Sequence, residues 1–245
     1  MRGRFVSDST AKLDRARGYP YDLPGRSYVW RGDGRDPLAV DHFDPALTEG
    51  RTPVLAVGSN QSPMQLARKY GADSDHVIPV QQTTVVDFDV VYAAQITSYG
   101  AVPAMLQHAP GVDVTLYATW LDDAQLEIMH ATEGNYHFAA IDDVTLRLDG
   151  GTVHRTIHLY VAKFGHLVHD DSAVSLAAVP ARGRRSEART TADMLRVVQA
   201  RLGEAGDHDA FVLRLVDDLG FRRECIERLS ENSVPFRHPY RVVES

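Results

Sequence analysis

The sequence predicts an α+β fold, in which a small mixed or antiparallel sheet or barrel is followed by helices. From residue 53 to about residue 179, apolar and polar residues alternate in short segments, which is typical of half-buried strands. From Ser186 onward, the apolar residues recur at helical spacing instead. Few crossover helices separate the strand segments, which favours antiparallel hairpins over a doubly wound parallel sheet.

The chain divides into three expected regions. Residues 1–52 are rich in Gly, Pro, Asp and Arg without sustained periodicity, so we expect an irregular extension that packs on the body. Residues 53–180 carry the strand pattern and form the expected central domain. Residues 181–245 form the expected C-terminal helical extension, packed on that domain.

The strand pattern is clearest in the segment TVVDFDVVYAA, residues 84–94. There Val86, Phe88 and Val90 alternate with Asp87 and Asp89, which are expected to face the other way. The other strand segments are VDVTLYATWL (112–121), DVTLRL (143–148) and TVHRTIHLYVAKF (152–164). The last two are joined by Asp-Gly-Gly at residues 149–151, a hairpin signal.

Three helices are predicted after residue 186. The first places Met194, Leu195, Val198 and Leu202 on one face. The second carries its apolar residues between 211 and 219, and the third lies around Ile226. Their spacing has no feature specific to a DNA-binding helix-turn-helix, so a helical cap on the sheet is expected.

Composition limits the classes of function. The 245 residues have a net charge of −7, which argues against a nucleic-acid or anionic-membrane partner. One cysteine, Cys225, allows neither an intramolecular disulfide nor a cysteine-built metal site. The apolar runs are short and the N-terminus lacks a secretory pattern, so a cytoplasmic protein is expected. The basic run at residues 182–189 is expected to be a solvated linker.

A tight loop follows the buried strand Val-Leu-Ala-Val at residues 54–57. Ser62 is a predicted helix N-cap, with Pro63 at the first position and Gln65 completing a capping box. The preceding residues 58–61 therefore form a strand-to-helix loop whose free N–H groups could hold an anion or a carbonyl oxygen. The alternative is an ordinary turn that Gly58 permits. A dinucleotide fingerprint is excluded, because only one of its glycines is present.

Glu133 stands at the end of a predicted helix. Asp122 caps this helix with Gln125 three residues later, and Gly134 ends it. A carboxylate in the last turn lies beside the negative end of the helix dipole, which costs local stability. Such a place favours proton uptake by a carboxylate and suits a general base. The alternative is a solvated glutamate that tolerates the cost.

These two stretches resemble the γ-glutamylcyclotransferase-like family over about residues 53–164. That family carries, in order, a Y-G-S-N loop after its first strand, a G-x-x-A segment, a P-G turn into a strand, and a short helix ending in E-G near a tyrosine. The matching segments here are Val57-Gly58-Ser59-Asn60, Gly100-Ala101-Val102-Pro103-Ala104, Pro110-Gly111, and Glu133-Gly134 with Tyr136. The first loop residue departs from the pattern, because Val57 stands where the family usually has tyrosine.

The resemblance implies a small β-barrel flanked by helices and a reaction on γ-glutamyl compounds. Glu133 would be the base of an intramolecular acyl transfer that releases 5-oxoproline and an amine or peptide. The substrate supplies its own nucleophile, so neither a metal nor another cofactor is implied. The implied substrate-binding residues are Val57, Gly58, Ser59, Asn60, Gln61 and Tyr136.

The alternative to an enzyme is a ligand-binding or regulatory module on the same fold. The change to Val57 and the two terminal extensions favour this alternative, and Glu133 at an unfavourable helix end opposes it. The leaving group, the physiological substrate and the oligomeric state stay open.

Overall fold

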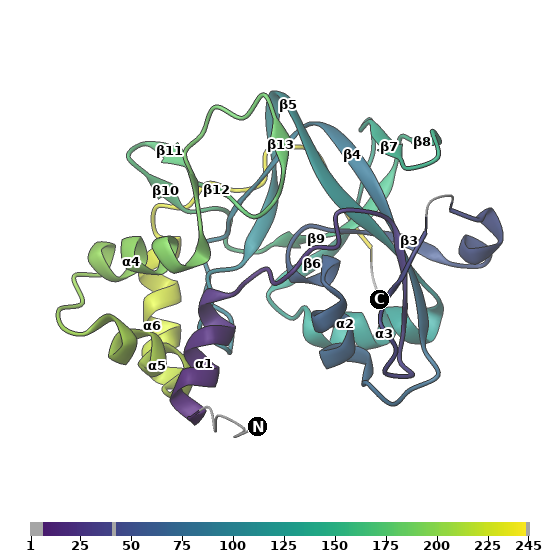
Figure 1. The fold of residues 1–245 in the computed structure, drawn as a ribbon. Helices are drawn as coiled ribbons and strands as arrows, with labels where there is room; N and C mark the ends of the chain where they lie inside the picture. Colours follow the sequence, from purple (N-terminus) through teal and green to yellow (C-terminus); the bar gives the residue numbers. More distant parts are fainter. Residues whose placement is uncertain (1–6, 41–42, 244–245) are drawn as a thin grey trace.

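A computed structural model describes residues 7–40 and 43–243 (Figure 1). In this part of the chain, six α-helices accompany one mixed sheet of 13 strands and a separate two-stranded ribbon. The α+β class is therefore confirmed. No helix in the described residues combines the length and apolar character needed to cross a membrane.

The helices, including two 3-10 turns, are α1 (Asp8–Arg17), η1 (Pro45–Thr48), η2 (Ser59–Gln61), α2 (Pro63–Tyr70), α3 (Asp123–Thr132), α4 (Thr191–Arg201), α5 (His208–Asp217) and α6 (Leu219–Ser230). The longer strands are β1 (Tyr28–Arg31), β3 (Thr52–Ala56), β4 (Val77–Tyr92), β5 (Ala104–Leu121), β6 (Tyr136–Ile141), β7 (Leu146–Leu148) and β9 (Ile157–Ala162). The two-residue strands are β2 (Leu38–Ala39), β8 (Val153–His154), β10 (Val168–His169), β11 (Ser172–Ala173), β12 (Ser175–Leu176), β13 (Ala181–Arg182), β14 (Ala188–Arg189) and β15 (Arg241–Val242).

The sheet is open, so the barrel prediction is wrong. The strand order along its main path is β14-β12-β4-β5-β3-β9-β6-β15, and no pairing among the described residues joins its two ends. The physical reason lies in the end strands, because β14 and β15 are two residues long and each pairs with a single neighbour. Most pairs are antiparallel, and β3 with β9 is one of the parallel pairs.

The longest ladder joins β4 to β5, which cross the centre of Figure 1. Its register runs from Val80 opposite Thr119 to Tyr92 opposite Ala104, with a bulge at Asp87. Asp87 has a φ of 64°, and its Oδ1 accepts the N–H of Gly111 at 2.7 Å. The strand prediction for residues 84–94 is confirmed up to Tyr92, but the bulge interrupts its alternation.

Asp89 is buried in an ion pair that the sequence pattern does not reveal. Its side chain was expected on the face of the strand opposite the apolar residues, and Asp89 is 2% exposed. The guanidinium group of Arg184 donates to both carboxylate oxygens, at 2.6 and 2.8 Å, and Ser175 donates to Oδ2 at 2.8 Å. Residues 182–189 are therefore not simply a solvated linker, although Arg182 within them is largely exposed.

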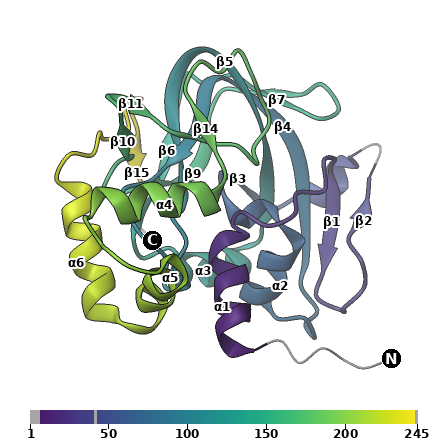
Figure 2. The ribbon, with the colours of Figure 1, turned by 60° about the vertical axis from the view of Figure 1, so that its left-hand side comes forward.

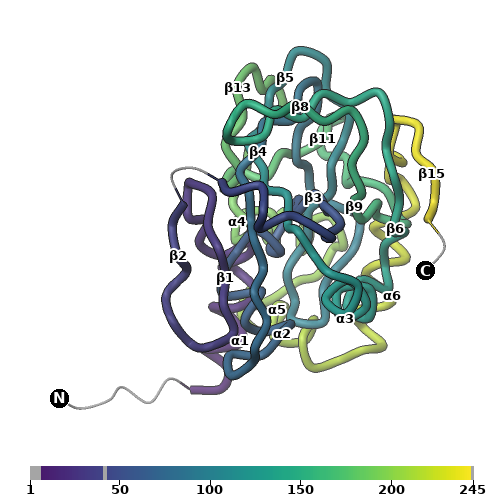
Figure 3. Tube along the Cα trace, turned by 90° about the vertical axis from the view of Figure 1, so that its right-hand side faces the viewer, coloured from purple at the N-terminus to yellow at the C-terminus, as the bar shows by residue number. Residues whose placement is uncertain are grey.

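The chain before β3 is more ordered than expected. Of residues 1–52, the described residues 7–40 and 43–52 include helix α1 and strand β1, which pairs with β4. Helix α1 packs against α4 and α5 (Figure 2). In the side view, β1 and β2 lie at one side of the molecule, while α6 and β15 lie at the other (Figure 3).

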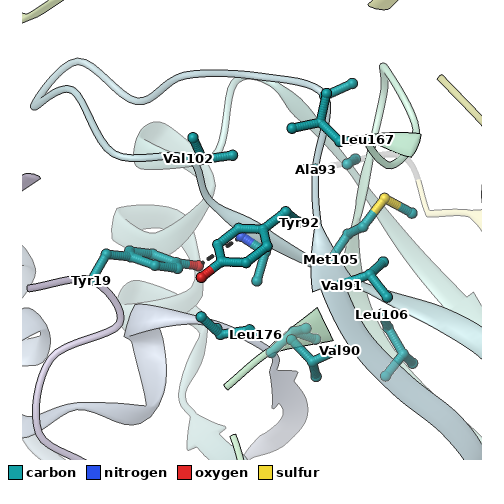
Figure 4. Close-up of a cluster of buried hydrophobic side chains, with 14 of the residues drawn as sticks. Tyr19, Val90, Val91, Tyr92, Ala93, Val102, Met105, Leu106, Leu167 and Leu176 are labelled. Carbon is teal, nitrogen blue, oxygen red and sulfur yellow. Dashed lines mark hydrogen bonds between the residues drawn. The ribbon is translucent and has the colours of Figure 1, made fainter. Parts of the chain in front are cut away.

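Tyr19 fixes the segment that follows α1. Its buried hydroxyl accepts the N–H of Ala104 at 2.9 Å, beside the ring of Tyr92 (Figure 4). Its backbone carbonyl accepts the hydroxyl of Thr191 at 2.7 Å, at the start of α4. The N-terminal segment is therefore bound both to the sheet and to the C-terminal helices.

The buried Arg184–Asp89 pair predicts that substitutions of Arg184 and of nearby Arg182 differ widely in their effect on the free energy of unfolding. Arg184→Met leaves the carboxylate of Asp89 buried without its cation, so the free energy of unfolding should fall by about 3–5 kcal/mol. Arg182→Met removes an exposed partner of Asp113 and should cost about 0–1 kcal/mol. Urea denaturation of both variants checks this, and equal losses would contradict the structural role of the buried pair.

Candidate active site

One cavity of about 510 Å³ gathers residues from five separate parts of the chain, one of which is β9 with Tyr160. The segment after α1 contributes Tyr19, and the loop between β3 and α2 contributes residues 57–60. The connection between β4 and β5 contributes Tyr99, and the end of α3 contributes Glu133. Because these parts are far apart in sequence, the cavity depends on the tertiary fold.

The loop after β3 presents backbone donors at the cavity. Ser59 and Asn60 open the turn η2, so their N–H groups have no intrahelical acceptor, and no other described residue receives them. Both residues line the cavity, together with Val57 and Gly58. The predicted binding loop therefore forms one wall of the cavity, and two of its N–H groups have no acceptor among the described residues.

Gln61 is the predicted loop residue that does not line the cavity. Its side chain is fully buried, and its amide nitrogen donates to the carbonyls of Val57 and Gly58 at 3.0 Å each. Gln61 therefore braces the loop from behind instead of facing a ligand. The capping box predicted for α2 also lacks its side-chain bond, although Ser62 is the N-cap residue.

A glycine is required at position 58 because the hydroxyl group of Tyr19 lies close to it, which the sequence does not show. A Cβ at this position would lie 1.9 Å from the hydroxyl oxygen of Tyr19. Any side chain at this position would therefore meet the Tyr19 phenol before it met a ligand in the cavity.

Glu133 lies at the C-cap of α3, one residue after the helix ends. The helix starts at the predicted capping box, in which the N–H of Gln125 donates to Asp122 at 2.9 Å and the Gln125 side chain accepts in return. The backbone N–H of Glu133 donates to the carbonyl of His130 at 3.1 Å. The local sequence thus sets where the helix ends and where Glu133 stands.

The carboxylate of Glu133 is held by two donors. Its Oε1 accepts Nζ of Lys69 at 2.5 Å and Nδ2 of Asn60 at 3.1 Å. The side chains of Lys69 and Glu133 are 5% and 13% exposed. The ammonium group offsets the unfavourable helix end, and Asn60 ties the loop to the carboxylate. Sequence reasoning missed Lys69, whose only local signal is a cation in the last turn of α2.

Four tyrosines surround this carboxylate: Tyr19, Tyr99, Tyr136 and Tyr160. Burial raises the pKa of each phenol, and the nearby charge of Glu133 adds to this for Tyr136 and Tyr160. The phenols therefore stay protonated at neutral pH and can serve as hydrogen-bond donors. Among the described residues that line the cavity, Glu133 is the one carboxylate and no histidine is present.

Other reactive groups lie away from the cavity. Cys225 is buried in α6, and burial raises the pKa of its thiol to about 11, so the thiol stays protonated at neutral pH. Within residues 7–40 and 43–243, no three His, Cys, Asp or Glu side chains gather as metal ligands. His166 is buried, with its Nδ1 beside the carbonyl of Leu167 at 2.9 Å.

No family model and no curated protein matches the chain. Solved structures do match, at low identity. A protein described as gamma-glutamyl cyclotransferase is 14% identical, with a TM-score of 0.38, over 79% of this chain and 94% of that one. An uncharacterized protein from Homo sapiens is 13% identical, with a TM-score of 0.39, over 80% and 95%.

A third match, a solution structure from Arabidopsis thaliana, is 16% identical with a TM-score of 0.34. It covers 46% of this chain, and this chain spans 62% of its length.

The close approach of Tyr19 to Gly58 predicts that substitutions at these two positions have coupled effects on stability. Gly58→Ala forces a methyl group against the phenol and should destabilise the fold by about 1–3 kcal/mol. In a Tyr19→Phe background the hydroxyl is gone, so the same Gly58→Ala change should cost less. Denaturation of the two single variants and the double variant measures this coupling. An equal cost in both backgrounds would show that Tyr19 does not constrain Gly58.

Proposed function

We propose that this protein catalyses an intramolecular acyl transfer on a γ-glutamyl compound, releasing 5-oxoproline and an amine or peptide. The observation that carries the proposal is the position of Glu133, the one carboxylate among the described lining residues, hydrogen-bonded to the loop that carries free N–H groups. The loop and helix motifs that resemble the γ-glutamylcyclotransferase-like family supply the reaction class.

In this reaction Glu133 accepts one proton from the α-ammonium group of the substrate. The freed amine attacks the γ-carbonyl carbon, and a five-membered ring closes. The carbonyl oxygen becomes an oxyanion, which the N–H groups of Ser59 and Asn60 stabilise. The bond to the leaving nitrogen then breaks as Glu133 returns its proton to the departing amine. The ring nitrogen gives up its second proton to the same amine, which leaves as an ammonium ion, and 5-oxoproline remains.

The two hydrogen bonds to Glu133 both end on the same carboxylate oxygen and leave the other oxygen free among the described residues. Lys69 and Asn60 both bond to Oε1, and no described residue donates to Oε2. Oε2 is thus available to the substrate ammonium, while Lys69 keeps the carboxylate in place. A positioned base of this kind contributes about 10²–10⁴-fold in rate, and an oxyanion donor about 10²–10³-fold.

A ligand-binding module is the second candidate, and one observation favours it. The Lys69 ammonium group lies 2.5 Å from Glu133 and is nearly buried, so the carboxylate already has a counter-charge. If this pair stays closed when ligand binds, the cavity holds a γ-glutamyl compound without converting it. Binding without release of 5-oxoproline would support this second candidate.

Glu133→Gln separates a catalyst from a binder. The amide keeps the size of the side chain but does not accept the ammonium proton, so kcat should fall by about 10²–10⁴-fold while ligand affinity persists. Glu127→Gln is the matched control, because Glu127 is an exposed residue of the same helix. Release of 5-oxoproline from a panel of γ-glutamyl compounds and calorimetric binding give the two readouts. Parent turnover in Glu133→Gln would exclude Glu133 as the base.

The same substitution has a predicted effect on stability. The helix dipole alone suggests that removing the charge of Glu133 would not destabilise the fold. The structure predicts a loss of about 1–3 kcal/mol instead, because the buried ammonium of Lys69 loses its charged partner. The loss should shrink in a Lys69→Met background, as measured by urea denaturation. An unchanged or higher stability of Glu133→Gln would contradict the importance of the ion pair.

A further inference from the structure

Two arginines at the cavity are each held over a tyrosine ring. The guanidinium carbon of Arg15 lies 4.6 Å from the ring centroid of Tyr99, and that of Arg68 lies 4.5 Å from that of Tyr21. The rings of Tyr21 and Tyr99 are themselves 6.4 Å apart, between centroids. Arg15, Tyr99, Tyr21 and Arg68 thus form a continuous series, which we call the arginine–tyrosine row.

Neither arginine of the row pairs with a carboxylate among the residues that the structure describes. Neighbouring cations on the same helices do have such partners: Arg17 on α1 pairs with Asp209, and Lys69 on α2 pairs with Glu133. Arg15 and Arg68 both line the cavity and both are exposed. Two cations of a protein with net charge −7 are therefore left open to a ligand.

The row also keeps the two guanidinium groups ordered. A guanidinium stacked on an aromatic ring loses fewer conformations when it binds, and it can still form a bidentate contact with a carboxylate. The hydroxyl of Tyr21 donates to the backbone carbonyl of Arg15 at 3.3 Å, which links the row to α1. An anion at the cavity thus meets two positioned cations.

We propose that Arg15 and Arg68 form an anion-binding subsite that selects substrates with an acidic departing group. This inference rests on the proposed function, and it names the leaving part of the substrate. Lys69 is engaged with Glu133, so these two arginines are the cations of the cavity that pair with no carboxylate of the described residues. The favoured leaving amine carries one or two carboxylates, and an uncharged alkylamine is disfavoured.

The test compares three γ-glutamyl compounds that differ in the charge of the leaving part. γ-Glutamyl-ethylamine carries no leaving-group carboxylate, γ-glutamyl-alanine carries one, and γ-glutamyl-glutamate carries two. For the wild-type protein, kcat/KM for 5-oxoproline release should rise with this charge, by about tenfold between the first and the last. Equal values for the three compounds would overturn the subsite.

Substitutions test whether the preference for a charged leaving group depends on Arg15 and Arg68. In Arg15→Gln combined with Arg68→Gln, the ratio of kcat/KM between γ-glutamyl-glutamate and γ-glutamyl-ethylamine should fall towards one. Arg17→Gln is the matched control, because Arg17 is on the same helix but does not line the cavity. Arg15→Lys with Arg68→Lys keeps the charges and should retain part of the preference. A ratio changed as much by Arg17→Gln would overturn the assignment.

Failure of the subsite can be told apart from failure of the proposed reaction. If none of the three compounds releases 5-oxoproline, the proposed reaction is wrong, and calorimetric binding of the same compounds then tests the subsite. Affinity that rises with leaving-group charge, and loses this rise in the double glutamine variant, supports it. Equal affinity for all three, or binding of none, overturns it.

Discussion

The antiparallel pairing of β4 with β5 is the constraint on which the cavity depends. Strand β3, which leads into the Gly58 loop, pairs with the second half of β5. The connection between β4 and β5 supplies Tyr99, and α3 follows β5 directly and ends next to Glu133. The two long strands thus hold together three of the five segments that line the cavity.

Within this frame, a few polar contacts join the segments into one site. Lys69 and Asn60 connect α2 and its preceding loop to Glu133, and Tyr19 connects the N-terminal segment to β5. Each contact is buried or nearly so, where an unpartnered polar group would be costly. Their combined effect is to fix Glu133, the Gly58 loop and the N-terminal segment relative to one another.

The parts of the fold that the sequence predicts are the local ones. The strand character of residues 84–92, the helical spacing after residue 190 and the capping box at Asp122 are set by neighbours in sequence, and the structure contains all three. The pairs Asp89–Arg184 and Lys69–Glu133 join residues 95 and 64 positions apart, so no local pattern reveals them. The open sheet was missed because closure depends on pairing at two-residue edge strands.

The bond between Thr191 and the carbonyl of Tyr19 spans 172 positions, and α1 packs on α4 and α5, which come late in the chain. During synthesis, the early segment that carries Arg15 and Tyr19 therefore lacks the helical part of its packing surface until α4 and α5 have emerged. Closing so long a loop costs entropy that later contacts must repay. A nascent chain that stops before α4 therefore lacks the helices that hold the N-terminal wall of the cavity in place.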